Sequence, residues 1–440
     1  MNKIIAFLLK ISILLFFYTS LFAQNYFIDS VNGDNKNDGK SAKTAWKTIK
    51  TINDVIKSND GIFLKRGSVF SGSSIEIDGL TNLRVGAYGK GAKPIISYDI
   101  PDGINIITSD AREGLALEIR NSNNIRVSDI EFQGGWASIV LTDSSMVKLL
   151  RLDVGKNSQY GIVIEGDDYS NHDITIDSCH IESRFSFPYS YADSKEKRTE
   201  DGIIIYSMNN SKITNNFFKN WGHASINLDA YREEAETEIS NILISGNYMT
   251  SPDIAYGGRI VLDDAHDSMI KNNNIVNTSV ASQLGGYNNK YINNLFLNTR
   301  TPFKVKDSDG EILEANNTAV LIEAYSGKDV SDNMYLRNRI INSEGVGLKI
   351  SDKGGLEIKN NSFEYNTISG CGNGEEANNI SIEVEPNSEG ASFSNSFKRN
   401  KINNIAQDTI LYRGEKMDVN KFNRQTSHDD LIKNNTWFQL

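Results

Sequence analysis

Four short hydrophobic runs in the middle of the chain are flanked by side chains that can move protons or bind anions. The runs are Gly161-Ile162-Val163-Ile164, Gly202-Ile203-Ile204-Ile205, Ser225-Ile226-Asn227-Leu228 and Arg259-Ile260-Val261-Leu262. The polar residues beside them are Tyr160, Glu165, Glu200, Asp201, Tyr206, His223, Asp229 and Asp263. If the runs are equivalent strands of neighbouring units, these side chains lie along a common side of the protein. The pattern predicts acid–base chemistry on an anionic substrate.

The reaction that suits this set is removal of the proton next to the carboxylate of a uronate. That proton is only weakly acidic, so cations must neutralise the carboxylate while a base is held at the carbon. Arg259 is the candidate for neutralisation, together with Lys304 or Lys306. His223 is the first candidate base, because imidazole transfers protons near neutral pH, and His266 is the second.

Further residues complete the predicted site. Tyr206 or Tyr231 would return a proton to the departing oxygen. The residues expected to bind the sugar are Tyr160, Asn227, Tyr231 and Lys306. The sequence identifies no cofactor, and it leaves open a dependence on Ca²⁺ or another divalent cation. Its candidate oxygen ligands are Asp229, Asp263 and Asp264.

Several reactions stay open at this point. A leaving oxygen on the next sugar makes the enzyme a chain-cleaving lyase, and a free hydroxyl on a terminal uronate makes it a dehydratase. A glycoside hydrolase would need two carboxylates about 5 to 9.5 Å apart, for which the candidates are Glu200, Asp201, Asp229 and Asp263. A C5-epimerase shares the first step, and a non-catalytic protein would only bind the glycan. We predict β-elimination on a uronate-containing polysaccharide or oligosaccharide.

Asparagine recurs at intervals that indicate stacked structural units. The recurring residues are Asn216, Asn247, Asn273, Asn294, Asn338, Asn366 and Asn400, separated by 31, 26, 21, 44, 28 and 34 residues. The shortest interval indicates that one coil takes roughly 21 residues, and the interval of 44 is about twice that length. The other intervals are longer because of insertions in the loops. Coils of three short strands cannot bury their inward side chains alone and must stack. The sequence therefore predicts an all-β parallel β-helix in which equivalent asparagines bond along a ladder.

The N-terminal region resembles a known superfamily. The segments that carry the resemblance are Tyr26-Phe27-Ile28-Asp29, Asn32-Gly33-Asp34, Thr44-Ala45-Trp46-Lys47-Thr48-Ile49, Ile62-Phe63-Leu64-Lys65-Arg66-Gly67 and Gly86-Ala87-Tyr88-Gly89-Lys90-Gly91. They are similar to the opening of secreted bacterial right-handed parallel β-helix proteins of the pectate-lyase-like superfamily. The resemblance implies a short helix over residues 44–56 that covers the N-terminal end of the solenoid. It identifies the fold better than the reaction, because members include lyases, glycosidases, epimerases and binding proteins.

A second resemblance surrounds His266. The segment Asp263-Asp264-Ala265-His266-Asp267 looks like the Asp-Pro-His-Asp/Glu turn of the alginate C5-epimerases. Ala265 stands where that family has proline, and the tyrosine that precedes the family's motif is absent. The resemblance implies a catalytic role for His266.

The domain plan follows from the ends of the chain. Residues 1–23 are expected to form a signal peptide cleaved near Ala23, because Lys3 precedes a hydrophobic stretch that ends in Leu21-Phe22-Ala23. The mature protein would then be secreted or periplasmic, without a stable membrane anchor. Residues 24–100 would form the N-terminal cap and first coils, 101–405 the β-helix, and 406–440 a C-terminal cap or tail.

Charge and cysteine content limit the partners. The net charge of -10 disfavours nucleic acid, whereas a local cluster of cations can still bind an acidic polysaccharide or oligosaccharide. The two cysteines, Cys179 and Cys371, lie far apart in sequence, and two buried free thiols are as compatible with it as a disulfide. We expect a monomer.

Overall fold

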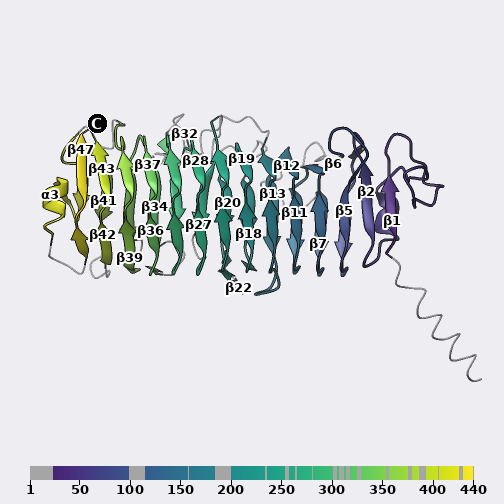
Figure 1. The fold of residues 1–440 in the computed structure, drawn as a ribbon, viewed down its shortest axis with the longest axis horizontal. Helices are drawn as coiled ribbons and strands as arrows, with labels where there is room; N and C mark the ends of the chain where they lie inside the picture. Colours follow the sequence, from purple (N-terminus) through teal and green to yellow (C-terminus); the bar gives the residue numbers. More distant parts are fainter. Residues whose placement is uncertain are drawn as a thin grey trace, which may run out of the picture.

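The computed structural model of the chain is a parallel β-helix, in which successive coils stack along the long axis of the molecule (Figure 1). The structure describes residues 23–98, 114–156, 158–183, 200–232, 235–252, 257–262, 265–279, 281–300, 305–306, 312–313, 318–324, 329–352, 356–374, 379–385, 393–404, 406–425 and 430–439. The expected all-β solenoid is therefore confirmed. The expected signal peptide and the predicted site residues Asp263, Asp264 and Lys304 lie outside the described residues.

Each coil contributes one strand to each of three long sheets, which we number by their order along a coil. Sheet 1 holds, in spatial order, β4 (Ile75–Asp78), β7 (Leu115–Arg120), β10 (Ala137–Thr142), β13 (Tyr160–Glu165), β16 (Asp201–Ile205), β20 (Ala224–Leu228), β26 (Arg259–Leu262), β29 (Ser282–Leu284), β34 (Val320–Ala324), β38 (Leu348–Asp352), β41 (Ile382–Glu385), β44 (Ile410–Tyr412) and β45 (Glu415–Met417). All neighbours in this sheet are parallel except the last pair.

Sheet 2 follows sheet 1 along each coil. Its strands are β1 (Asn25–Ile28), β2 (Gly61–Lys65), β5 (Arg84–Tyr88), β8 (Arg126–Ser128), β11 (Lys148–Leu150), β14 (Thr175–Asp177), β18 (Lys212–Thr214), β24 (Leu243–Ser245), β27 (Met269–Lys271), β30 (Lys290–Ile292), β36 (Met334–Leu336), β39 (Ile358–Glu364), β42 (Phe393–Lys398) and β46 (Leu431–Lys433), with β35 (Val330–Ser331) beside β39.

Sheet 3 completes the coil. Its strands are β3 (Val69–Ser71), β6 (Ile95–Tyr98), β9 (Glu131–Gly134), β12 (Asp153–Lys156), β15 (His180–Glu182), β19 (Phe217–Lys219), β25 (Tyr248–Thr250), β28 (Asn274–Val276), β31 (Leu295–Leu297), β37 (Arg339–Ile341), β40 (Thr367–Ser369), β43 (Lys401–Asn404) and β47 (Thr436–Gln439). Three small pairs are separate from these three long sheets: β17 (Met208–Asn209) with β23 (Ile239–Ser240), β21 (Tyr231–Arg232) with β22 (Ala235–Glu236), and β32 (Val305–Lys306) with β33 (Ile312–Leu313).

The predicted asparagine ladder is present at the turn between sheets 2 and 3. From Asn216 to Asn435, each side-chain Nδ2 donates to the Oδ1 of the next ladder residue at 3.0 to 3.2 Å. The same Oδ1 atoms accept the backbone N–H of the preceding ladder residue, and the Nδ2 groups also bond backbone carbonyls. These bonds satisfy polar groups that the tight turn would otherwise leave buried without partners. The ladder therefore fixes the position of the turn in each coil.

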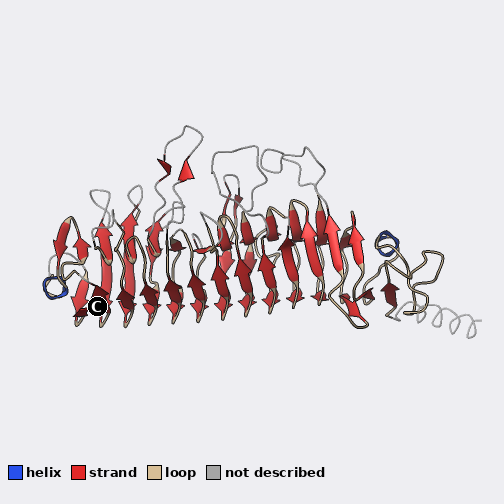
Figure 2. Cartoon of the chain, turned by 90° about the horizontal axis from the view of Figure 1, so that it is seen from above, coloured by secondary structure: helices blue, strands red, loops and turns tan. Residues whose placement is uncertain are grey.

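Both ends of the solenoid carry a short helix, as Figure 2 shows in blue. At the N-terminal end α2 spans Lys50–Asn53 only, so the prediction of a helix over 44–56 is wrong in length. The reason is that Trp46 pairs its backbone with Ile28 and anchors its indole Nε1 on the carbonyl of Asn37 at 2.7 Å, which holds this segment out of a helix. Ile49 and Ile52 are fully buried, so the segment still covers the core.

At the C-terminal end α3 (Val419–Phe422) closes a column of aromatic rings. Tyr291, Tyr335, Phe363 and Phe397 stack nearly parallel, with centroids 4.6 to 4.7 Å apart, and Phe422 of α3 meets Phe397 edge-on at 5.7 Å. The helix thus covers apolar rings that would otherwise face water at the end of the stack.

Cys179 and Cys371 are free and buried. Burial raises the pKa of the Cys179 thiol to about 12 and that of Cys371 to about 11, so both stay protonated near neutral pH. No helix among the described residues is long and apolar enough to span a membrane.

Candidate functional site

The strand alignment expected from the sequence is confirmed by the register of sheet 1. Ile162 of β13 pairs with Ile203 of β16, which pairs with Ile226 of β20, which pairs with Ile260 of β26. These side chains point into the core, and all four are fully buried. The polar residues that precede the four strands therefore lie on adjacent coils at one edge of sheet 1.

Three side chains at this edge bond to one another. Asp201 begins β16, His223 directly precedes β20, and Arg259 begins β26. The Asp201 Oδ1 atom lies 2.9 Å from His223 Nδ1, and Arg259 Nη2 lies 2.5 Å from His223 Nε2. The sequence predicted His223 and Arg259 as separate parts of one site, and the structure places them in direct contact. The sequence places Asp201 in the same row and offers it as a hydrolase carboxylate, but does not predict its role in holding His223.

The partners of His223 determine its hydrogen-bonding roles. A guanidinium can only donate, so Nε2 of His223 must present its lone pair to Arg259. The carboxylate of Asp201 accepts the proton on Nδ1, which makes His223 a neutral imidazole in one tautomer. Asp201 is itself held by the backbone N–H of Ala224 at 2.9 Å and by Asn227 Nδ2 at 3.3 Å. The basic nitrogen of His223 is therefore aimed at Arg259.

Two buried polar atoms beside this group lack a hydrogen-bond partner within the described part of the chain. They are Nε of Arg259 and Oδ1 of Asn227. Buried polar atoms are rarely unpaired in native proteins, so each of these two would be stabilised by a polar partner. One is a donor and the other an acceptor, which suits a substrate with both a carboxylate and hydroxyl groups.

An aromatic pair lies on the neighbouring coils of the same edge. Trp136 directly precedes β10, Tyr160 begins β13, and their ring centroids are 5.3 Å apart. The N–H of Glu200 bonds the carbonyl of Gln159, so the coil that carries Asp201 is the neighbour of the coil that carries Tyr160. Tyr160 and Asp201, each one residue further along, therefore lie side by side on adjacent coils. Both rings are partly buried against an outer apolar cluster formed by Ala137, Val140, Val163 and Ile204. The sequence predicted Tyr160 but missed Trp136. Trp136 could have been found from its position directly before a strand that aligns with the other four.

Two other predicted residues lie at the opposite end of these strands. Tyr206 follows β16, five residues after Asp201, which is about 16 Å along an extended strand. Asp229 lies beside Tyr206 on the next coil, since its N–H bonds the carbonyl of Ile205. The structure therefore does not bring Tyr206 or Asp229 to His223. Tyr231 and Lys306 lie in the small pairs β21–β22 and β32–β33, and their side chains are outside the description.

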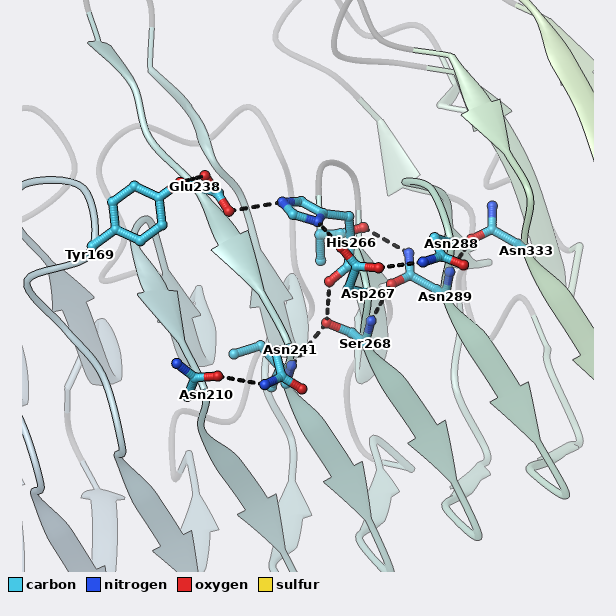
Figure 3. Close-up of polar contacts among 12 residues, drawn as sticks. Tyr169, Asn210, Glu238, Asn241, His266, Asp267, Ser268, Asn288, Asn289 and Asn333 are labelled. Carbon is cyan, nitrogen blue, oxygen red and sulfur yellow. Dashed lines mark hydrogen bonds and ion pairs between the residues drawn. The ribbon is translucent and has the colours of Figure 1, made fainter.

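His266 belongs to a separate cluster, shown in Figure 3. It lies between β26 and β27, at the turn from sheet 1 to sheet 2. Its Nδ1 is 2.7 Å from Asp267 Oδ2, its Nε2 is 3.1 Å from Glu238 Oε1, and its ring stacks on Tyr287 at 4.5 Å. The hydroxyl of Tyr169 donates to the other oxygen of Glu238.

This cluster favours the charged forms of its carboxylates. The hydrogen bond from Tyr169 holds the pKa of Glu238 below its usual value, and the bond from His266 does the same to the pKa of Asp267. Each ring nitrogen of His266 faces a carboxylate of the protein, so neither is directed at a substrate proton. Of the two predicted bases, His223 therefore has the geometry of a base and His266 that of a bridge between carboxylates.

The described residues contain no group of three or more His, Cys, Asp or Glu side chains arranged to hold a metal ion. Of the three predicted ligands only Asp229 is described, and it lies away from His223. A Ca²⁺ site with Asp263 and Asp264 stays a prediction.

No family model matches the chain, and no curated protein matches it by sequence. Solved structures do match. A mannuronic-acid-specific polysaccharide lyase of family 6 from human gut microbiota shares 12% identity over 95% of this chain and 91% of its own, with a TM-score of 0.52. The catalytic unit of a GH87 α-1,3-glucanase from Streptomyces thermodiastaticus shares 12% identity over 93% of this chain and 68% of its own, with a TM-score of 0.56. At these identities the likeness shows the parallel β-helix fold alone, and membership of the pectate-lyase-like superfamily stays a prediction.

Proposed function

We propose that the chain is a carbohydrate-active enzyme that cleaves or dehydrates uronate-containing polysaccharide or oligosaccharide by β-elimination. The observation that carries this proposal is the bonded group Asp201–His223–Arg259 beside the unpaired Nε of Arg259. It combines an oriented neutral base with a cation that has a free donor, which are the two requirements for removing a proton next to a carboxylate.

Arg259 would bind the substrate carboxylate. A guanidinium matches a carboxylate through two parallel N–H bonds, and Nε with Nη2 form one such pair of donors. When Nη2 turns to the carboxylate, it releases the lone pair of His223 Nε2. Binding of the correct substrate thereby uncovers the base.

His223 would then take the proton from the carbon next to the carboxylate. The electron pair of that C–H bond forms the new carbon–carbon double bond, and the bond from the neighbouring carbon to the leaving oxygen breaks. Asp201 stabilises the imidazolium that results and keeps the ring oriented. The leaving oxygen must gain a proton, and we assign this role to Tyr160, because it lies one coil from Asp201 whereas Tyr206 lies at the far end of the strand.

The paired-carboxylate alternative fits this edge less well. Asp201 is 2% exposed and its oxygens are bonded to His223, Ala224 and Asn227, so it cannot act directly on a glycosidic bond. Asp229 lies at the other end of the strands. We therefore place elimination ahead of hydrolysis by the pair Asp201 and Asp229.

Product analysis tests the proposal. The mature protein is incubated with a panel of uronate polymers and their saturated oligomers, and the products are examined by mass spectrometry. Shortened chains with an unsaturated end indicate a lyase, and loss of one water without shortening indicates a dehydratase. Products that have gained water would contradict the proposal and support a hydrolase.

A further inference from the structure

A row of cations runs along the outer face of sheet 2. Register pairs Arg84 with Arg126 and Arg126 with Lys148, and the row continues through Thr175 to Lys212. It then passes Leu243 and Met269 and reaches Lys290. We call the five charged members, which are all exposed, the basic stripe: Arg84, Arg126, Lys148, Lys212 and Lys290.

The coil geometry sets the spacing of the stripe. Each member is the first or nearly the first residue of its strand, and the next residue inward, such as Val127 or Ile213, is fully buried. Alternation therefore forces the charged side chain outward. Neighbouring strands lie about 4.8 Å apart, so the stripe extends for roughly 34 Å along the solenoid axis.

The stripe is a local excess of positive charge on an acidic protein. No member makes a salt bridge with another described residue, and the net charge of the chain is -10. The acids that flank it are engaged elsewhere. Asp173 and Asp267 bond the rings of His172 and His266, and Asp177 accepts from Thr214 and Asn215. The cations are therefore available to an external anion.

The stripe also borders a groove with a volume of about 440 Å³. Its lining includes Lys212 and Lys290 of the stripe and Lys271 from the adjacent outward column. Side-chain amides of Asn210, Asn241 and Asn288 line one edge, and Figure 3 shows them along the ends of the strands. Asp267 is a carboxylate in the same lining, so the three ammonium groups leave it with an excess of positive charge. Such cations beside a series of amides suit a polymer that carries both carboxylates and hydroxyl groups.

We propose that the basic stripe binds an extended polyuronate chain along the solenoid axis, as a binding site separate from the group around His223. The identity of the chain rests on the proposed function, whereas the preference for an extended polyanion rests on the stripe alone. The eight aligned positions from Arg84 to Lys290 contain no aromatic residue on which nucleic-acid bases could stack. The stripe holds one part of the polysaccharide to the enzyme while another part of the same polysaccharide occupies the edge of sheet 1.

Binding is measured with the full-length His223→Ala protein, which we expect to turn over the polymer at least about 100-fold more slowly than the wild type. Affinity for polygalacturonate and for alginate is compared with and without Lys212→Glu/Lys290→Glu. The matched control is Arg339→Glu/Lys401→Glu, which changes the net charge equally at exposed positions of sheet 3. We expect the stripe variant to bind at least about tenfold more weakly at low salt and the control to bind within about twofold of its parent.

Equal weakening by both variants would show a general charge effect and overturn the proposal, as would binding of DNA without binding of either polyuronate. Turnover separates this inference from the proposed function. With His223 intact, the stripe variant should keep its rate on short oligosaccharides and show a raised KM on the polymer. If no uronate is turned over at all, the proposed function fails, and the affinity comparison still decides whether the stripe binds.

Discussion

Arg259 lies with Nη2 2.5 Å from Nε2 of His223, so the cation of the candidate site covers its own base. The contact requires that Nε2 of His223 carry no proton, because Arg259 can only donate and its partner must accept. A carboxylate that draws Arg259 away would expose the lone pair at the place where the proton must be removed. In the proposed reaction, this contact would couple binding of the substrate carboxylate to exposure of the base.

Asp201→Asn tests the charge that supports His223. Oδ1 of Asp201 accepts from both Nδ1 of His223 and the N–H of Ala224, so an amide oxygen can keep both bonds, but the amide lacks the negative charge that stabilises the imidazolium. We expect kcat to fall by about 10² to 10⁴ while the fold is retained. Steady-state kinetics with thermal unfolding as the control would check this, and a kcat near that of the wild type would contradict the assigned role.

Arg259→Lys tests bidentate recognition. Lysine keeps the charge but has no fork of donors, so substrate binding should weaken even though the carboxylate is still neutralised. We expect a loss in kcat/KM of at least about tenfold, and a larger loss for Arg259→Ala. The matched control is Arg339→Lys on sheet 3, which should leave kinetics unchanged. Equal kinetics for wild type and Arg259→Lys would argue against carboxylate binding at this residue.

Trp136→Ala tests the aromatic pair as a sugar-binding surface. The pair lies on the coils next to Asp201, and removal of the indole should raise KM about tenfold with little change in kcat, because the ring contacts sugar rather than reacting atoms. Tyr248→Ala removes an exposed ring from sheet 3 and serves as the control. A fall in kcat with unchanged KM would place Trp136 in the chemistry instead.

Asn273→Ala tests the asparagine ladder. Asn273 is fully buried, its Nδ2 bonds Ile244 O and Asn294 Oδ1, and its Oδ1 accepts from Asn247. Alanine leaves these groups unpaired, so the free energy of unfolding should fall by about 3 kcal/mol or more. Chemical denaturation measures the loss. The neighbouring exposed Asn274→Ala should change stability far less, and equal effects would contradict the ladder's role.

The cluster around His266 predicts a pH-dependent contribution to stability. The pKa of Glu238 is lowered from its usual 4.5, mainly by the hydrogen bond from Tyr169, so the folded state prefers the ionised carboxylate. Its stabilisation is present above the unfolded pKa and is lost as pH falls through the lower folded pKa. Unfolding of wild type and Glu238→Gln should differ near neutral pH and converge in acid. A difference that grows in acid would contradict this sign.

The solenoid was predictable because its signals are local and repeated. Asn216 and Asn273 each follow a short strand with a buried isoleucine at its centre, and the same turn chemistry recurs in later coils, so the spacing indicated stacking. The length of the N-terminal helix was not predictable, because the backbone pairing of Trp46 with Ile28 is a tertiary contact.

The site was predictable only in part. Alignment of strands placed His223 and Arg259 on one side, since His223 directly precedes its strand and Arg259 begins its strand. Their direct bond and the supporting role of Asp201 depend on the three-dimensional register and on a bulge between Ala224 and Ile226, which no spacing reveals. The separation of Tyr206 from His223 likewise follows from strand length rather than from residue type.

The most direct test of the central claim is the rate at which near-ultraviolet absorbance rises when the protein is mixed with a uronate polymer that yields an unsaturated product. We predict a steady rise with the wild-type protein and a rate at least about 100-fold lower with His223→Ala, because the base is gone. His180→Ala, which removes an exposed imidazole on sheet 3, should match the wild type. An equal rate with His223→Ala, or no rise on any uronate polymer or oligomer, would rule out elimination with His223 as the base.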